Sequence, residues 1–218
     1  MPDTVHVLLP LSLLEAIRNV DTPEGGDIEY VQELRNKRFG LSDTVYAQIR
    51  RYADAMKRGQ PIAVDEATSL ARLIGRRADA EQVFRNAGRI IANRMYERLP
   101  RATRQLTHIL PKFVARPIAF RRMRQAFSKY LDGSLRKSGR HLILEVTNSV
   151  TIAGSSGAEG CTFYAAAIAE LLRLVAGDGV TVDHVGCRKT GARSCEWSAD
   201  WGQHKRPAGT SSSGTADA

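Results

Sequence analysis

Apolar residues recur at helical spacing through most of the first 130 residues. The pattern predicts helices at Leu11–Asn19, Ile28–Lys37, Asp43–Arg58, a segment capped by Asp65, Asp79–Leu99 and Arg101–Leu110. The clearest of them is Asp79–Leu99, where Phe84, Ile91 and Met95 form one apolar stripe and Pro100 follows as a stop signal. The first part of the chain is therefore expected to be helical.

Gly88 interrupts this apolar helix. A glycine inside a helix costs about 1 kcal/mol relative to alanine. Either a close contact with a second helix or a ligand pressing on this site explains it, or the glycine is simply tolerated.

The pattern changes after residue 131. Turns at Asp132–Ser134 and Ser138–Gly139 lead into His141–Ser149, whose two faces are both apolar, as in a central strand. A helix from Cys161, stopped by Gly177 and Gly179, precedes a strand over residues 180–185, a polar turn and a returning strand at Ser194–Ser198. The expected fold is α+β, with N-terminal helices and a helical layer packed on a small antiparallel sheet.

The segment Ala153–Gly160, between the strand at His141–Ser149 and the helix from Cys161, is rich in glycine and serine. This composition predicts a flexible connection, which is either a lid or pocket rim or a plain surface loop.

All three cysteines of the chain fall in the last of these elements. Cys161 opens the helix, and His184, Cys187 and Cys195 follow on the two strands and the turn between them. Three thiolates and an imidazole form a closed tetrahedral zinc set of the Cys3His type, which has a structural role. The metal would join the start of the helix to the edge of the sheet at the C-terminal end of the fold.

Other interpretations of these residues are open. Free cysteines often pack as small buried hydrophobes, and a histidine on a strand is often a hydrogen-bonded polar residue. A disulfide would leave one of the three cysteines over. Asp183 or Glu196 could complete the metal site in place of His184.

Composition adds a basic character. The 218 residues carry a net charge of +9, and basic residues concentrate between Lys112 and Arg140. There, Phe120, Met123 and Phe127 share one helical face, which predicts an amphipathic helix with a solvated basic side. Nucleic-acid binding is the alternative, without a helix-turn-helix, RNA-recognition or finger signature to support it. The basic side could also attract anionic headgroups at a membrane surface, as a peripheral contact.

Signals for export or membrane insertion are missing from the sequence. The apolar run VHVLLPLSLL has no preceding Lys or Arg and is broken by Pro10. No window reaches the length of a transmembrane segment. A soluble, cytoplasmic protein is expected.

The cysteine region resembles a known family. Cys161 with its helix, and the tail from His184 through Cys187 and Cys195 to Trp197, are similar to the 4-vinyl reductase domain, which is also the ligand-sensing module of phenol-responsive bacterial regulators. That family carries Cys, Glu-x-x-Cys and a final Cys followed by an aromatic residue. Here His184 stands at the glutamate position, which exchanges one type of zinc ligand for another.

The likeness extends from about residue 78 to Trp197 and is closer to the stand-alone members of bacteriochlorophyll synthesis. It rests on Ala87–Pro100, His108–Ala115, His141–Val150 and the helix that Cys161 opens. The implied organisation is an N-terminal helical extension at 1–77, a zinc- and ligand-binding domain at 78–201 and a disordered tail at 202–218.

The resemblance also implies a hydrophobic pocket between helices and sheet that holds a small aromatic or tetrapyrrole ligand. The matching apolar residues that we expect to line it are Phe84, Ile91, Met95, Phe113, Phe120, Met123, Phe127, Tyr130, Phe163 and Tyr164.

Two functions follow from the resemblance. In the first, the chain is a carrier or accessory protein of bacteriochlorophyll biosynthesis, and thus of photosynthesis, that binds a vinyl-bearing, chlorophyllide-type tetrapyrrole and works with pigment-synthesis enzymes. In the second, it is a sensor or adaptor for a small hydrophobic ligand, acting through a partner protein and able to form a homodimer. The sequence carries no glycine-rich NAD(P)H fingerprint, flavin motif or iron–sulfur cysteine set that would support a reductase.

Overall fold

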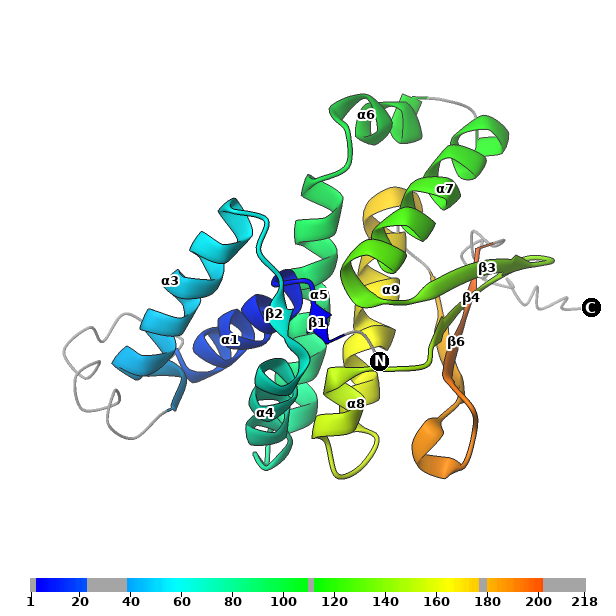
Figure 1. The fold of residues 1–218 in the computed structure, drawn as a ribbon. Helices are drawn as coiled ribbons and strands as arrows, with labels where there is room; N and C mark the ends of the chain where they lie inside the picture. Colours follow the sequence, from blue (N-terminus) through cyan, green and yellow to red (C-terminus); the bar gives the residue numbers. More distant parts are fainter. Residues whose placement is uncertain (1–2, 23–38, 110–111, 177–179, 202–218) are drawn as a thin grey trace, which may run out of the picture.

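The computed structural model describes residues 3–22, 39–109, 112–176 and 180–201 and confirms an α+β fold (Figure 1). The helices in these ranges are α1 (Leu8–Asp21), α3 (Asp43–Lys57), α4 (Val64–Gly75), α5 (Ala80–Glu97), α6 (Arg101–Ile109), α7 (Lys112–Leu131), α8 (Val150–Gly154) and α9 (Glu159–Ala176). The expected helix Ile28–Lys37, the helix stop at Gly177 and Gly179, and the tail from residue 202 lie outside the described residues.

The main sheet has four antiparallel strands in the order β3 (Ser134–Ser138), β4 (His141–Val146), β6 (Cys195–Asp200) and β5 (Val182–Gly186). The predicted central strand is confirmed, because β4 lies between β3 and β6. Trp197 of β6 is paired with Leu144 on one side and with His184 on the other. Short strands β1 (Thr4–Val5) and β2 (Ile62–Ala63) form a separate pair.

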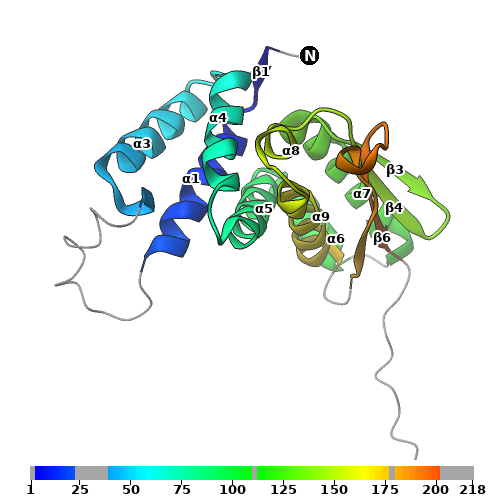
Figure 2. The same cartoon turned by 90° about the horizontal axis from the view of Figure 1, so that it is seen from below.

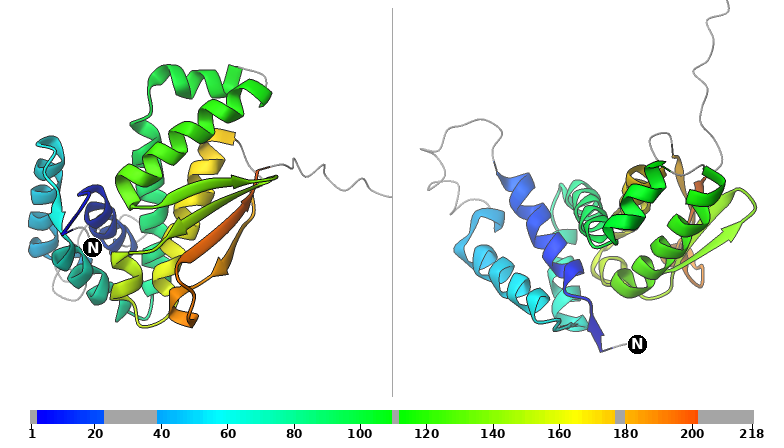
Figure 3. Two further views of the ribbon diagram at one scale, coloured as in Figure 1. Left: turned by 45° about the vertical axis from the view of Figure 1, so that its right-hand side comes forward. Right: turned by 90° about the horizontal axis from the view of Figure 1, so that it is seen from above.

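The helices form layers on one side of the sheet. Helices α5 and α9 lie side by side between the N-terminal helices and the sheet, as Figures 1 and 2 both show. Helix α1 packs on α5, and α7 and α9 contact the strands, with the sheet at the outer side of the molecule (Figure 3). One buried apolar cluster runs from Val7 in front of α1 to Trp197 in β6.

The amphipathic character expected for α7 is present. Met123 and Phe127 are buried, Phe120 packs against the core, and Arg121 and Arg124 are exposed. The aromatic face of this helix is therefore core, and its basic face is solvated.

Two local expectations need correction or refinement. Asp65 does not cap α4, because the helix begins at Val64 after Ala63, and the N–H of Val64 donates to the carbonyl of Asp3 in front of β1. The glycine- and serine-rich segment is not a continuous loop. Its first residues end α8, which the Ser149 hydroxyl caps by accepting a hydrogen bond from the Ile152 N–H.

Gly88 marks a close helix contact. A Cβ atom at this position would lie 2.2 Å from the carbonyl oxygen of Phe163 and 2.9 Å from the Cβ of Ala166, both on α9. The close-contact explanation of this glycine is therefore confirmed. The backbones of α5 and α9 approach more closely than any side chain at residue 88 would allow.

We expect Gly88→Ala to destabilise the fold by about 1–3 kcal/mol, because overpacking forces the two backbones apart. A loss of stability would indicate the close contact, because the same substitution in a helix without such a contact raises stability by about 1 kcal/mol. Urea unfolding followed by circular dichroism measures it. An unchanged or increased free energy of unfolding would contradict the contact.

Candidate metal site and ligand cavity

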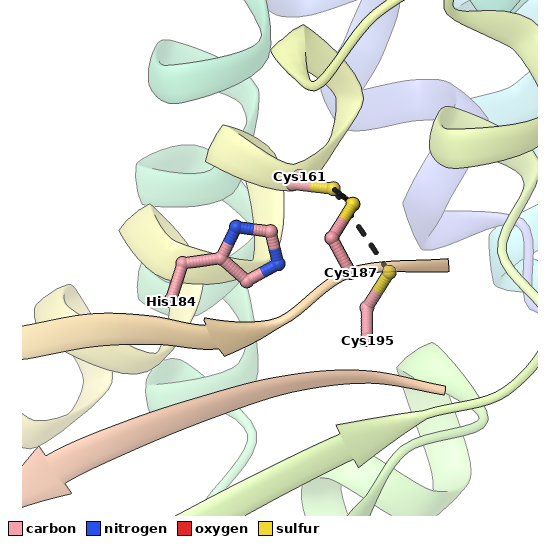
Figure 4. A group of neighbouring side chains, drawn as sticks. All are labelled: Cys161, His184, Cys187 and Cys195. Carbon is pink, nitrogen blue, oxygen red and sulfur yellow. Dashed lines mark hydrogen bonds between the residues drawn. The ribbon is translucent and has the colours of Figure 1, made fainter. Parts of the chain in front are cut away.

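Four side chains converge where α9, β5 and β6 meet. The ligand atoms of Cys161, His184, Cys187 and Cys195 all lie within 4.8 Å of one another (Figure 4). The Cys161 sulfur is 3.7 Å from that of Cys187 and 4.0 Å from that of Cys195. These residues could hold a metal ion.

An irregularity in β5 allows His184 and Cys187 to join the same cluster. Residues three apart in a regular strand point to opposite faces of a sheet. The pairing of β5 with β6 shifts register between His184 and Gly186, so Cys187 joins the cluster on the same side as His184. Val185, between the two shifted positions, is 59% exposed. The sequence pattern alone did not predict this bulge.

The turn after Cys187 is held in place around the sulfur atoms. It forms a short 3-10 helix, Arg188–Thr190, which ends at Gly191 with a φ of 96°. The Arg188 N–H donates to the Cys195 sulfur at 3.2 Å, and the Lys189 ammonium donates to the Ser155 carbonyl at 2.7 Å. Such contacts around a ligand set orient the ligands before a metal binds.

The donor set fits tetrahedral zinc. With Zn–S bonds of about 2.3 Å, two sulfurs of a regular tetrahedron lie about 3.8 Å apart, close to the observed 3.7 and 4.0 Å. A disulfide needs a sulfur separation of about 2.05 Å, and all three cysteines are free. The geometry therefore matches a metal centre better than a covalent bridge.

Burial disfavours ionisation of two of the three thiols, those of Cys161 and Cys195. Burial raises the pKa of Cys161, and the sulfurs of Cys195 and Cys187 raise it further. Burial also raises the pKa of Cys195. For Cys187, burial acts upward, but hydrogen bonds from the Lys189 and Thr190 N–H groups and from the thiols of Cys161 and Cys195 together lower its pKa. A divalent cation favours the thiolate outright, so it would offset the repulsion between three adjacent thiolates.

His184, rather than a nearby carboxylate, is the fourth member. Asp183 pairs with Ser198 and so lies on the opposite sheet face from His184. The Glu196 carboxylate accepts from Arg136 at 3.5 Å and from the Ser194 hydroxyl at 3.4 Å. Neither acid belongs to the cluster.

Aromatic stacking connects this cluster to the interior. The His184 ring stacks on Trp197 with a centroid distance of 5.0 Å and an interplanar angle of 13°. Tyr164, one turn after Cys161 on α9, stacks on the same indole at 5.2 Å. Trp197 and Tyr164 are fully buried. Trp197 therefore links His184, a member of the metal cluster, to Tyr164.

Tyr164 forms part of the wall of a cavity of about 380 Å³. The cavity lies between the N-terminal elements β1, α1 and α4 and the ends of α7, α8 and α9. Its polar lining includes His6, Asp65, Tyr130, Asn148, Ser149 and Tyr164. We call it the Tyr164 cavity. Ala153, from the glycine- and serine-rich segment, also lines it.

His6 is the least expected residue of this lining. The N–H of Leu8 donates to its Nδ1 at 3.1 Å, and its ring meets Tyr130 edge-on at 4.6 Å. Burial, and then the charges of Lys129 and Arg98, lower its pKa to about 4, so the imidazole is neutral at pH 7. A titratable residue inside the apolar run VHVLLPLSLL was the only sequence signal that could have pointed to it.

The ten residues expected to line one pocket are placed in three ways. Seven are fully buried: Phe84, Ile91, Met95, Met123, Phe127, Phe163 and Tyr164. Of these seven, only Tyr164 is among the residues that line the Tyr164 cavity. Tyr130 lines the same cavity, and Phe120 lines a separate one near Trp201. The side chain of Phe113 lies outside the described part of the structure.

Comparison with family models, with curated proteins and with solved structures gives no match to this chain. Among the described residues, no helix has both the length and the apolar character needed to cross a bilayer. The chain is thus an α+β protein with a Cys3His cluster able to hold a metal ion.

Proposed function

We propose that this chain is a zinc-stabilised module that binds a small hydrophobic ligand in the Tyr164 cavity. The ring column from His184 through Trp197 to Tyr164 carries the proposal, because it joins the metal cluster directly to the cavity wall. Zn²⁺ with four protein ligands has no open position, so its contribution is structural. The metal would fix α9 against β5 and β6, and thereby the Tyr164 ring that lies behind the cavity wall.

The size of the cavity bears on the choice of ligand. Ligand pockets range from about 300 to 1,000 Å³, and about 380 Å³ lies near the lower end. Such a space favours a molecule of one or two rings with one polar end over a tetrapyrrole macrocycle. This observation favours the sensor or adaptor function, with a small ligand and a partner protein.

The position of the cavity supports the same function. Val5 and Val64 of the N-terminal elements form one wall, and Tyr130 and Tyr164 form the other. A ligand there would contact the N-terminal helices and the zinc-bearing part at once. Binding would therefore stabilise their contact, which is what a module that signals through its N-terminal helices requires.

A titration with 1-naphthol, a two-ring alcohol, tests the proposal on zinc-quantified protein. We expect saturable quenching of tryptophan fluorescence, lost in Thr68→Phe, which fills the cavity from α4, and kept in Ser69→Phe, its exposed neighbour. Equal binding by both variants, or none by the native chain, would refute the small-ligand site.

A tetrapyrrole carrier of bacteriochlorophyll synthesis is the second proposal, and it rests on the resemblance of the cysteine region. Titration with a divinyl chlorophyllide-type pigment, with and without NADPH, tests it by absorbance. A saturable shift without reduction would support a carrier, and reduction would indicate an enzyme. No shift at any concentration would remove the tetrapyrrole function and leave the metal site untouched.

A further inference from the structure

A second cavity lies at the other end of the sheet. It has a volume of about 430 Å³ and is lined by Arg116, Pro117, Phe120, Lys137, Arg140 and Trp201. These residues come from α7, from the β3–β4 hairpin and from the residue after β6. Trp201 lies six positions after Cys195, or about 20 Å along an extended strand. The cavity also shares no lining residue with the Tyr164 cavity. This Trp201 cavity is therefore distinct from both the metal cluster and the Tyr164 cavity.

Trp201 carries a buried donor without an acceptor. Its indole Nε1 is buried and has no hydrogen-bond partner among the described residues. The residue itself is held firmly, since its backbone N–H donates to the Arg140 carbonyl at 3.1 Å. An unpaired buried donor costs about 1–3 kcal/mol. An oxygen acceptor supplied by a ligand in the adjoining cavity would remove this cost.

All charged side chains that line the cavity are positive. Arg116, Lys137 and Arg140 are exposed at its mouth, and no described carboxylate lines it. None of the three forms an ion pair within the described ranges, in contrast to Arg136, which reaches Glu196 at 3.5 Å. Three cations around one cavity raise the local potential and attract an anion.

The apolar lining is aromatic. Phe120 and Trp201 meet edge-on with centroids 6.5 Å apart, and Leu142 lies buried beside them. Ring edges and faces at this spacing accept a third ring of a ligand. The cavity therefore combines an aromatic floor, a single N–H donor and a cationic rim.

We propose that the Trp201 cavity binds a small aromatic carboxylate. The ring of the ligand packs on Phe120 and Trp201, and one carboxylate oxygen accepts the indole N–H. The other oxygen meets Arg140 or Lys137, where a charge-assisted hydrogen bond is about twice as strong as a neutral one. The same anionic chemistry could come from the propionate of a tetrapyrrole, so the test separates the two sources. This site does not depend on the Tyr164 cavity.

Isothermal titration with 1-naphthoate, and with 1-naphthamide as its uncharged analogue, tests the charge. We expect naphthoate to bind at least about tenfold more tightly and to lose this advantage as salt is raised. Arg140→Ala should weaken naphthoate binding by about tenfold and leave naphthamide unchanged, whereas Arg121→Ala, on the exposed face of α7, should change neither. Equal affinity for the two probes, or equal effects of the two variants, would overturn the proposal.

Trp201→Phe isolates the indole donor. It keeps a ring against Phe120 and removes the N–H, so both probes should bind several-fold more weakly. An unchanged affinity would overturn the role of the donor, and circular dichroism of each variant checks that the fold is intact.

Two competitors identify the source of the anion. The first competitor is a chlorophyllide-type pigment. If it displaces naphthoate from the native chain but not from Thr68→Phe, the anion belongs to the ligand of the Tyr164 cavity, and a separate small-acid site is overturned. Random duplex DNA that displaces naphthoate at physiological salt would assign the basic rim to nucleic acid and likewise overturn it. Failure of both to displace it supports the small acid.

Discussion

Replacing Cys195 by serine should abolish stoichiometric zinc binding and leave most of the chain insoluble or unfolded. Structural zinc contributes about 10 kcal/mol or more of coupled folding energy in small domains, and a typical domain has only about 5–15 kcal/mol in total. Cys195 is fully buried and starts β6, so its loss also disturbs the sheet. Metal analysis by mass spectrometry and thermal unfolding measure the two effects.

The neighbouring residue provides the control. Glu196→Gln removes a charge next to Cys195 but leaves the four ligands, and we expect full zinc content and a small change in melting temperature. Cys187→Ser should resemble Cys195→Ser. Cysteine variants that retain one zinc per chain with an unchanged melting temperature would show that the cluster is not a metal site. That outcome would remove zinc from the proposed function, and the titrations with 1-naphthol and 1-naphthoate would still test the two cavities.

The second large effect concerns a buried ion pair near the N-terminal helices. Asp21, at the end of α1, is 3% exposed and accepts hydrogen bonds from Arg77 at 2.6 and 3.1 Å and from the Gly40 N–H at 2.7 Å. Asp79 also holds the Arg77 guanidinium, at 2.7 Å, and the two acids raise the pKa of Arg77, which stays charged. Asp21→Ala would leave the buried Gly40 N–H without its acceptor and would leave Arg77, whose side chain is 23% exposed, paired with Asp79 alone.

We expect Asp21→Ala to lower the free energy of unfolding by about 1–3 kcal/mol, the cost of leaving a buried donor without its acceptor. The double variant Asp21→Ala/Arg77→Met should recover part of this loss. Asp54→Ala, which breaks the exposed pair with Lys57, should cost at most about 1 kcal/mol. A loss for Asp21→Ala as small as that for Asp54→Ala would contradict the structural role of the pair.

Local signals in the sequence predicted much of the fold. The helical stripe of α5, the amphipathic α7 and the central position of β4 all follow from periodicity, which depends on nearby residues only. The four members of the cluster could be predicted because cysteine and histidine are few in this chain and have specific chemistry. These features needed no knowledge of the tertiary arrangement.

The remaining features depend on contacts distant in sequence. Asp21 and Arg77 are 56 residues apart, and nothing in the pattern pairs them. The two cavities arise where separate elements fail to fill the space between them, so the pattern of no single segment predicts them. The expected pocket residues illustrate this limit, because apolar residues on one helical face fill a core as readily as they line a cavity.

A metal ion bound by this cluster would also change the unfolded chain. It would tie Cys161 to Cys195, 34 positions apart in sequence, and a cross-link closing a loop of that length removes about 3–4 kcal/mol of chain entropy from the unfolded state. A disulfide would offer the same constraint only under oxidising conditions. A thiolate-bound ion would keep it in a reducing environment, and its strength would follow the supply of metal.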